Sequence, residues 1–221
     1  MYIDSHMAID QAHKKLLYRH VFVLAALALI SGWLFVWLAQ EVVIEKKDWF
    51  DTLAFQFLRP WITPAHTTIA LVVTRGGSDA FLIAVYLLIF YYLLRNNFKR
   101  QAIQLVVVAS APFLWSWLLK KIFHRPRPLP PHFDYVISYS FPSGHTLGTF
   151  TLCGILAWIT WKIKWPFITK LTATIFLFLY ACVIGMSRVY LHVHYLSDVV
   201  AGACVALCWL AIAAVFIKLT D

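Results

Sequence analysis

The chain has 221 residues, of which 62% are hydrophobic and only 13% are charged, and its formal net charge is +9. Soluble domains are about 45–50% apolar and about 25% charged, so this composition excludes a disordered chain, a fibrous protein and most soluble folds. The basic residues stand at the ends of apolar segments, which is typical of lipid headgroup contacts and not of a nucleic-acid surface. We therefore predict an all-α, polytopic membrane protein.

Six apolar segments approach the length of about 20 residues that a helix needs to cross about 30 Å of hydrocarbon. The first is too long for the hydrophobic region of a signal peptide and lacks a clear cleavage site, so we expect it to be retained. Residues 1–20 before it form a cytoplasmic tail, whose opening looks in part like a cloning remnant with Met7 as a native start. The six predicted transmembrane helices are residues 21–40, 78–95, 102–119, 146–162, 168–186 and 198–217.

Residues 41–77 lie between the first and second predicted spans. Their apolar portions are interrupted by Arg59-Pro60, Pro64 and His66, and the remainder has an amphipathic pattern. We expect one or two interfacial helices here instead of a further span. The whole chain, residues 1–221, is then a single membrane domain.

The charges of the loops give an orientation. Basic residues are nearly balanced between the two sides, but the side that follows the odd-numbered spans also carries most of the acids. Several of its basic residues belong to the polar segments described next. By the excess of Lys and Arg in cytoplasmic loops, both termini are predicted to be cytoplasmic.

Polar residues outside the spans are concentrated in three segments. The first is Lys120-x6-Arg127-Pro128, the second is Pro142-Ser143-Gly144-His145, and the third is Ser187-Arg188-x5-His194-x3-Asp198. Two predicted spans separate the second segment from the third, and an even number of crossings returns the chain to the same face. We therefore expect all three segments at one membrane surface.

The first two segments, with the arginine of the third, have the chemistry of an anion site. Lys120, Arg127 and Arg188 would bring three cations to the mouth of the bundle, where they can bind phosphate oxygens. Gly144 allows close approach of the backbone, and the Ser143 hydroxyl with the free N–H groups of a helix start would complete the site. The alternatives are headgroup contacts for each cation and a simple N-cap for Ser143.

The third segment supplies a histidine and an acid. His194 and Asp198 are four residues apart and share a helix face, so the carboxylate can hold one imidazole nitrogen and leave the other free to attack. His192 is about 240° round the helix from that acid, and we interpret it as a structural residue or as part of the wall of the site. Other polar residues that we consider less suited to catalysis are His66, His124, His132 and Asp134.

A zinc site is the competing interpretation. His145, His194 and Asp198 could act as two nitrogen ligands and one oxygen ligand. Three positive side chains beside them would crowd a cation and favour an anion. We therefore expect neither a metal nor another cofactor.

The ordered triple of motifs resembles the signature of the phosphatidic acid phosphatase type 2 superfamily, without departure at any signature position from Lys120 to Asp198. The resemblance implies hydrolysis of a phosphate ester or diphosphate through a phosphohistidine. His194 would be the nucleophile, oriented by Asp198, and His145 would protonate the leaving oxygen. It also implies that the phosphoryl oxygens are held by Lys120, Arg127, Ser143, Gly144 and Arg188.

The predicted spans imply a lipid substrate that reaches the site from the bilayer of a cell (inner) membrane, with the site on the periplasmic or extracellular side. Candidates are phosphatidylglycerol phosphate, phosphatidic acid, undecaprenyl diphosphate and lipid A phosphate. A lipid phosphotransferase is the main alternative. An anion transporter is a second, but the spans contain almost no ionisable residues for a path across the membrane. No nucleic-acid partner is expected, and the sequence indicates no oligomeric state.

Overall fold

The computed structural model describes residues 2–128 and 138–220, and all regular structure in these ranges is helical, as predicted. The short elements include two 3-10 turns, η2 (Arg59–Trp61) and η3 (Arg75–Gly77), and the π-helical turn η1 (Gln40–Ile44) that continues the first helix. The α-helices are α1 (Tyr2–Ala39), α2 (Trp49–Leu58), α3 (Pro64–Thr74), α4 (Asp79–Arg95), α5 (Lys99–Phe123), α6 (Gly144–Lys162), α7 (Phe167–Tyr190) and α8 (Leu196–Thr220).

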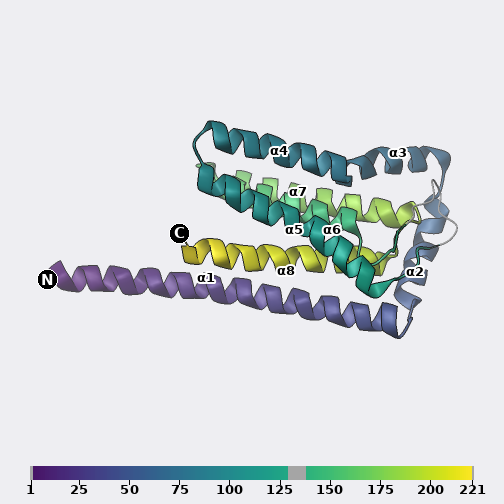
Figure 1. Cartoon of the computed structure of the whole chain (residues 1–221), viewed down its shortest axis with the longest axis horizontal. Helices are drawn as coiled ribbons and strands as arrows, with labels where there is room; N and C mark the ends of the chain where they lie inside the picture. The colour runs from purple at the N-terminus through teal and green to yellow at the C-terminus, as the bar shows by residue number, and fades with distance from the viewer. Residues whose placement is uncertain (1, 129–137, 221) are drawn as a thin grey trace.

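The long helices run side by side, and α2 lies across one end of the bundle (Figure 1). Helix α6 is central, because it packs against α4, α5, α7 and α8, while α1 packs along α8. The end of α5, the start of α6 and the connection from α7 to α8 all lie at the α2 end (Figure 1). The bundle therefore places the three polar segments at one end.

The outer surface of the bundle is apolar. Large hydrophobic side chains are exposed along several helices, more than a water-facing surface tolerates. A lipid environment satisfies them, because hydrocarbon tails replace the missing protein contacts. Examples of these exposed residues are Phe22, Leu29, Trp33, Leu87, Leu88, Ile103, Phe176 and Phe216.

The prediction of six spans is not confirmed by helix length and hydropathy. Among the described residues, four helical stretches are long and apolar enough to cross a membrane: 18–44, 99–123, 167–190 and 196–218. Residues 64–77 and 79–95 together form a fifth candidate, bent by 42°. Helix α6 does not qualify, because its many Thr and Gly residues, including Thr146, Gly148 and Thr151, are buried against neighbouring helices and need no lipid-facing hydrophobicity. The count of six therefore stays a prediction.

The segment of residues 41–77 contains two different helices. Helix α2 crosses the end of the bundle, where an interfacial helix would lie (Figure 1). Helix α3 instead packs against α7 and is followed by η3 and α4 in a bent pair. This segment therefore also contributes to the walls of the bundle, which the sequence pattern did not predict.

Close packing of α8 against α6 depends on Gly202. A Cβ at this position would stand 2.7 Å from the carbonyl oxygen of Ser143 and 3.3 Å from the backbone nitrogen of Leu147. Both atoms belong to the backbone at the start of α6, so no side chain can move aside. The register of the two helices at the polar end is therefore tight.

We expect Gly202→Ala to destabilise the protein by about 1–3 kcal/mol, the usual cost of overpacking a rigid contact. Thermal unfolding in detergent measures this loss. Gly32→Ala is the matched control, because the nearest atom to its Cβ would be Cys208 Sγ at an ordinary 3.7 Å. Equal unfolding temperatures for the two variants would contradict the close approach.

Candidate active site

The carboxylate of Asp198 organises the start of α8. Its Oδ2 accepts a hydrogen bond from the backbone nitrogen of Tyr195 at 2.9 Å, so this acid reaches back to the residue that precedes the helix. The same oxygen accepts from Ser140 Oγ and lies 3.3 Å from Nδ1 of His194. Both Asp198 and His194 are almost fully buried. The pair predicted from the i,i+4 spacing is therefore in contact.

Contacts on the two imidazole nitrogens of His194 indicate its tautomer. Nδ1 faces the carboxylate of Asp198, an acceptor, while Nε2 lies 3.2 Å from Nη1 of Arg127, which can only donate. The hydrogen is therefore assigned to Nδ1, and Nε2 carries the lone pair. Burial lowers the pKa of His194 to about 3, although its hydrogen bond and charge interaction with Asp198 act to raise it. The imidazole is consequently neutral at pH 7.

Arg127 is held in place by the backbone around it. Its Nε donates to the carbonyl oxygen of Ser138 at 2.8 Å, and Nη2 donates to the hydroxyl of the same residue at 2.8 Å. Nη1 donates to the carbonyl oxygen of Val193 at 2.6 Å as well as facing His194. The guanidinium is thus fixed beside the free nitrogen of the imidazole.

Helix α6 begins at this site. Ser143 lies just before it, and its hydroxyl accepts from Thr146 Oγ1 at 3.0 Å and more weakly from the Thr146 nitrogen at 3.5 Å. The backbone nitrogen of Ser143 donates to the carbonyl oxygen of Asp198 at 3.0 Å, which ties the start of α6 to α8. In this arrangement the Ser143 side chain is a buried cap. The backbone at Gly144 is also confined, because a Cβ there would stand 2.8 Å from Ser116 Oγ.

His145 follows at the second position of α6 and is half-buried. It lies within electrostatic reach of Arg188, His194, Lys120 and Arg127, which are four of the predicted site residues. A Cβ on Gly77, in the turn after α3, would come within 3.4 Å of its ring. The two predicted histidines therefore belong to the same cluster.

In the part of the chain that the structure describes, the three cations of the cluster, Lys120, Arg127 and Arg188, form no salt bridges. Arg188 is 5% exposed and donates from Nη1 to Thr74 Oγ1 at 2.8 Å, while its buried Nε has no partner among the described atoms. Buried guanidinium donors are normally satisfied, so this set is arranged to receive an anion.

Several residues of the site were not predicted. Ser140 bonds to the Asp198 carboxylate, Thr74 holds Arg188, and Arg125 donates to Asp198 Oδ1 at 2.7 Å. Arg125 lies within the first polar segment, at one of the six positions between Lys120 and Arg127 to which no role was assigned. No local pattern singles out Thr74, because its partner is more than a hundred residues away in the chain.

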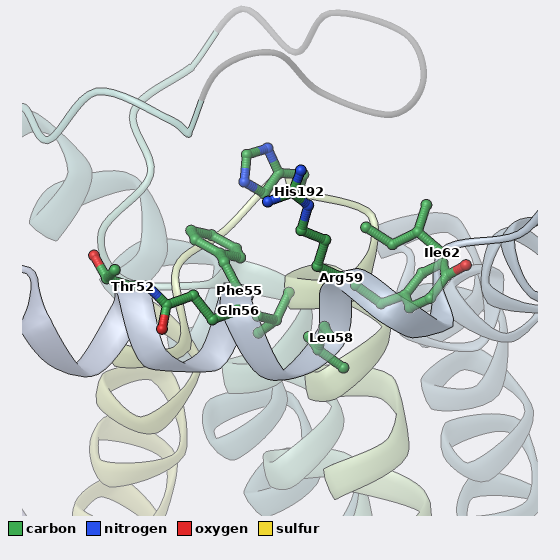
Figure 2. A pocket seen from close by; sticks show the side chains of 9 residues that line it. Thr52, Phe55, Gln56, Leu58, Arg59, Ile62 and His192 are labelled. Carbon is green, nitrogen blue, oxygen red and sulfur yellow. The ribbon is translucent and has the colours of Figure 1, made fainter.

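The remaining histidines of the described ranges lie elsewhere. His124 is exposed, with its ring against Tyr139, and His66 bonds through Nδ1 to the carbonyl oxygen of Trp61 at 2.8 Å. His192 has its ring 4.2 Å from that of Phe55 and lines a separate, mainly apolar cavity of about 500 Å³ beside α2 (Figure 2). The predictions for His132 and Asp134 fall outside the described residues.

The alternative zinc set can be compared with this geometry. Asp198 is bonded to Arg125, and the open nitrogen of His194 faces Arg127. Among the described residues, no three His, Cys, Asp or Glu side chains are grouped so as to hold a metal ion. The donor set is therefore that of an anion site.

Comparisons with known proteins agree with the signature motifs. Residues 100–220 match the model of the PAP2 superfamily, which is more than half of the chain, so the chain belongs to this superfamily. It is a membrane lipid phosphatase of the PAP2 type, a phosphoric ester hydrolase.

Individual relatives are similar in sequence or in fold. Phosphatidylglycerophosphatase B of Bacillus subtilis (strain 168) is 29% identical over 150 residues, which cover 65% of this chain and 70% of the relative. The crystal structure of a transmembrane PAP2-type phosphatidylglycerolphosphate phosphatase from Bacillus subtilis has a TM-score of 0.80 at 22% identity, over 88% of this chain and 97% of that one. Aquifex aeolicus LpxE has a TM-score of 0.55 at 24% identity, over 76% and 93%. The two structures show the fold.

We expect buried, neutral His194 to make the fold sensitive to acid. Its pKa is about 3 in the folded protein and about 6.5 in an unfolded chain, so the unfolded state binds the extra proton first. The stability that this group contributes is complete above pH 6.5 and is lost as the pH falls toward 3, at up to about 1.4 kcal/mol per pH unit.

Unfolding of the wild type and of His194→Asn, compared in detergent between pH 7 and pH 4, measures this linkage. Asparagine does not titrate, so the advantage of the wild type should shrink steadily on acidification. A difference that stays constant with pH would show that His194 is not held neutral.

Proposed function

We propose that the protein hydrolyses the phosphomonoester or diphosphate headgroup of a bilayer lipid through a phosphohistidine on His194, without a metal ion. The observation that carries this proposal is the group of Lys120, Arg127 and Arg188, which lies within electrostatic reach of His145 and has no salt bridge within the described part of the chain. A tetrahedral phosphate dianion would supply the missing negative charge. Phosphoryl transfer depends mainly on such positioning and charge stabilisation.

In the first step, Nε2 of His194 attacks phosphorus with its lone pair. The bond between phosphorus and the lipid oxygen breaks, and His145 gives its proton to that oxygen, so the lipid leaves as an alcohol or, from a diphosphate, as a monophosphate. Asp198 keeps the Nδ1–H of His194 in place and balances the positive charge that forms on the imidazole. Because the bound dianion places negative charge beside His145, the protonated imidazole is favoured once the substrate is bound.

In the second step, water takes the place of the lipid. His145, now neutral, accepts a proton from the water as its oxygen attacks the phosphorus of phosphohistidine. The bond between phosphorus and Nε2 breaks, the electron pair returns to His194, and inorganic phosphate leaves. The three cations neutralise the charge on the phosphoryl oxygens in both steps.

Among lipid substrates, we propose phosphatidylglycerophosphate first, because the relative with 29% identity is a phosphatidylglycerophosphatase. Phosphatidic acid, undecaprenyl diphosphate and lipid A phosphate present the same terminal phosphate and remain the comparison set. Phosphate release from these four lipids in matched detergent micelles ranks them by kcat/KM. A higher kcat/KM for any other lipid would overturn the order proposed.

We further propose that the site faces the outer side of the cytoplasmic membrane and that both termini are cytoplasmic. The distribution of basic residues supports this orientation. Lys162 and Lys164 are exposed, and Lys170 is partly exposed, around the connection from α6 to α7, at the end of the bundle opposite the site. Positive loops are retained on the cytoplasmic side.

We expect His194→Ala and His145→Ala each to lower kcat by more than about 10³-fold while the protein stays folded. Phosphate release in the presence of EDTA gives the rate, and size-exclusion chromatography in detergent gives the folded state. His66→Ala, at an exposed histidine whose side chain bonds to the carbonyl oxygen of Trp61, is the matched control. In the wild type, a phosphoryl label on protein that is stable to alkali and lost in acid would reveal the intermediate. Turnover like that of the wild type in either site variant would reject the assigned role.

We expect Arg188→Lys to lose about 10²-fold in kcat, because a planar fork with several donors becomes a single point charge. Lysine also cannot bond to Thr74 and the substrate with the same geometry. The same phosphate-release assay measures the loss. Arg95→Lys, at an exposed position at the far end of α4, should leave the rate unchanged. If both substitutions behave alike, Arg188 does not bind phosphate.

A further inference from the structure

Helix α2 buries one side chain, and that side chain is a carboxylate. The helix contains several aromatic and aliphatic residues, and none of them is buried, yet Asp51 is only 1% exposed. Burying an ionised carboxylate is costly unless it is paired and hydrogen-bonded. The position of Asp51 therefore points to a specific partner.

Asp51 binds the start of α8. Its Oδ1 accepts from the backbone nitrogen of Ser197 at 2.8 Å, and its Oδ2 accepts from the Ser197 hydroxyl at 2.7 Å. A carboxylate at the first turn of a helix is favoured by the free N–H groups and by the helix dipole. Asp51 thus caps, from another helix, the turn that carries Asp198.

Arg125 joins the two carboxylates. Its Nη2 donates to Asp51 Oδ2 at 2.8 Å, and its Nη1 donates to Asp198 Oδ1 at 2.7 Å and to the Ser197 hydroxyl at 2.7 Å. The guanidinium also lies 3.9 Å from the centre of the Tyr195 ring, and its side chain is 8% exposed. Both terminal nitrogens of the Arg125 guanidinium are therefore hydrogen-bonded within the protein and are not available to a substrate.

The two oxygens of Asp198 therefore have different partners. Oδ1 is bound by Arg125, while Oδ2 faces His194, Ser140 and the Tyr195 nitrogen. With Oδ1 fixed, the carboxylate cannot rotate away from the imidazole. Arg127, two residues further along the chain, contacts the other imidazole nitrogen, so one short loop determines both sides of the ring.

We propose that Asp51 and Arg125 are positioning residues for the hydrolytic reaction, which hold Asp198 against Nδ1 of His194 without touching the substrate. The proposal rests on the function proposed above, because it assigns these residues a role only if His194 reacts with phosphorus. It extends the site to α2, a helix outside the three signature motifs. A displaced reacting group costs rate while the phosphate-binding residues stay in place.

The variants Asp51→Asn and Arg125→Gln test this role, with phosphate release from one defined lipid in detergent micelles as the assay. Asp48→Asn is the matched control, because Asp48 is exposed, precedes the same helix and makes no side-chain cap. We expect kcat to fall by about 10- to 100-fold in both test variants, with KM changed by less than about threefold. The control should keep the kcat of the wild type.

The pH profile separates positioning from a general loss of structure. The charged and titratable groups that act on His194 are Asp198 from α8, Arg127 and Lys120 from α5 and its following loop, and His145 from α6. Without the Arg125 cation, the full charge of Asp198 acts on the imidazole, so the acid limb of kcat/KM should move to higher pH by about 1 unit. In Asp51→Asn, Asp198 is the remaining carboxylate paired with Arg125, so the acid limb of kcat/KM should not move to higher pH.

Each outcome decides the proposal. Folded Asp51→Asn and Arg125→Gln proteins with the kcat and pH profile of the wild type would overturn it, as would equal shifts of the limb in both. If Arg125→Gln does not fold, Ser197→Ala replaces it in the comparison of kcat with KM, because this variant removes one hydroxyl from the network. An unchanged kcat in Ser197→Ala then rejects the positioning role. His194→Ala, measured alongside, separates failure of the proposed function from failure of the positioning role. An active His194→Ala enzyme would reject the proposed function. An inactive His194→Ala enzyme together with a normal Asp51→Asn enzyme would reject only the positioning role.

Discussion

Four hydrogen bonds converge on the buried carboxylate of Asp198, from Tyr195 N, Ser140 Oγ, His194 Nδ1 and Arg125 Nη1. The first of them is a local consequence of helix capping, since an acid in the first turn reaches back to an N–H group that the helix leaves free. That bond fixes the orientation of the Asp198 side chain, so its Oδ2 atom faces the imidazole of His194, four residues earlier in the chain. The imidazole of His194, the proposed nucleophile, therefore takes its position from the way in which α8 begins.

Charge divides the site into two layers. In one layer, Arg125 forms salt bridges with both Asp51 and Asp198, and all three side chains are buried. In the other, Lys120, Arg127 and Arg188 have no acid within salt-bridge distance in the described ranges. The imidazole of His194 stands between the layers, with one nitrogen toward each. This difference in charge across the imidazole favours an anion on the Nε2 side and a proton on Nδ1. Attack of Nε2 on a phosphate requires the same arrangement.

The sequence contained enough information to bring the motif residues together, because the short spacing of His194 and Asp198 keeps them adjacent and an even number of crossings places the motifs at one end. The predicted helix face is wrong in detail, since His194 lies in the turn before α8 and the Asp198 side chain reaches back to it. The sequence contained no comparable signal for Asp51. That residue is 74 positions from Arg125 and 146 from Ser197, and it lies in a segment whose amphipathic pattern indicated only a surface helix. For helix α6, the sequence pattern was difficult to interpret for a different reason. Its buried Thr and Gly residues reduce the hydropathy by which spans are recognised, because its environment is protein on nearly every side.

Helix α2 links the reaction site to the membrane surface. Its inward side presents Asp51 to the start of α8, while Trp49, Leu53 and Phe57 are exposed on the same helix. Tryptophan and other large apolar side chains at a bundle end favour the headgroup region of a bilayer, where lipid phosphates lie. Since the Asp51–Arg125–Asp198 contacts tie α2 to the carboxylate beside His194, the depth of α2 in the interface would also set the depth of His194. In the proposed reaction, α2 would thereby keep the nucleophile at the level of the lipid headgroups without contacting the reacting phosphate.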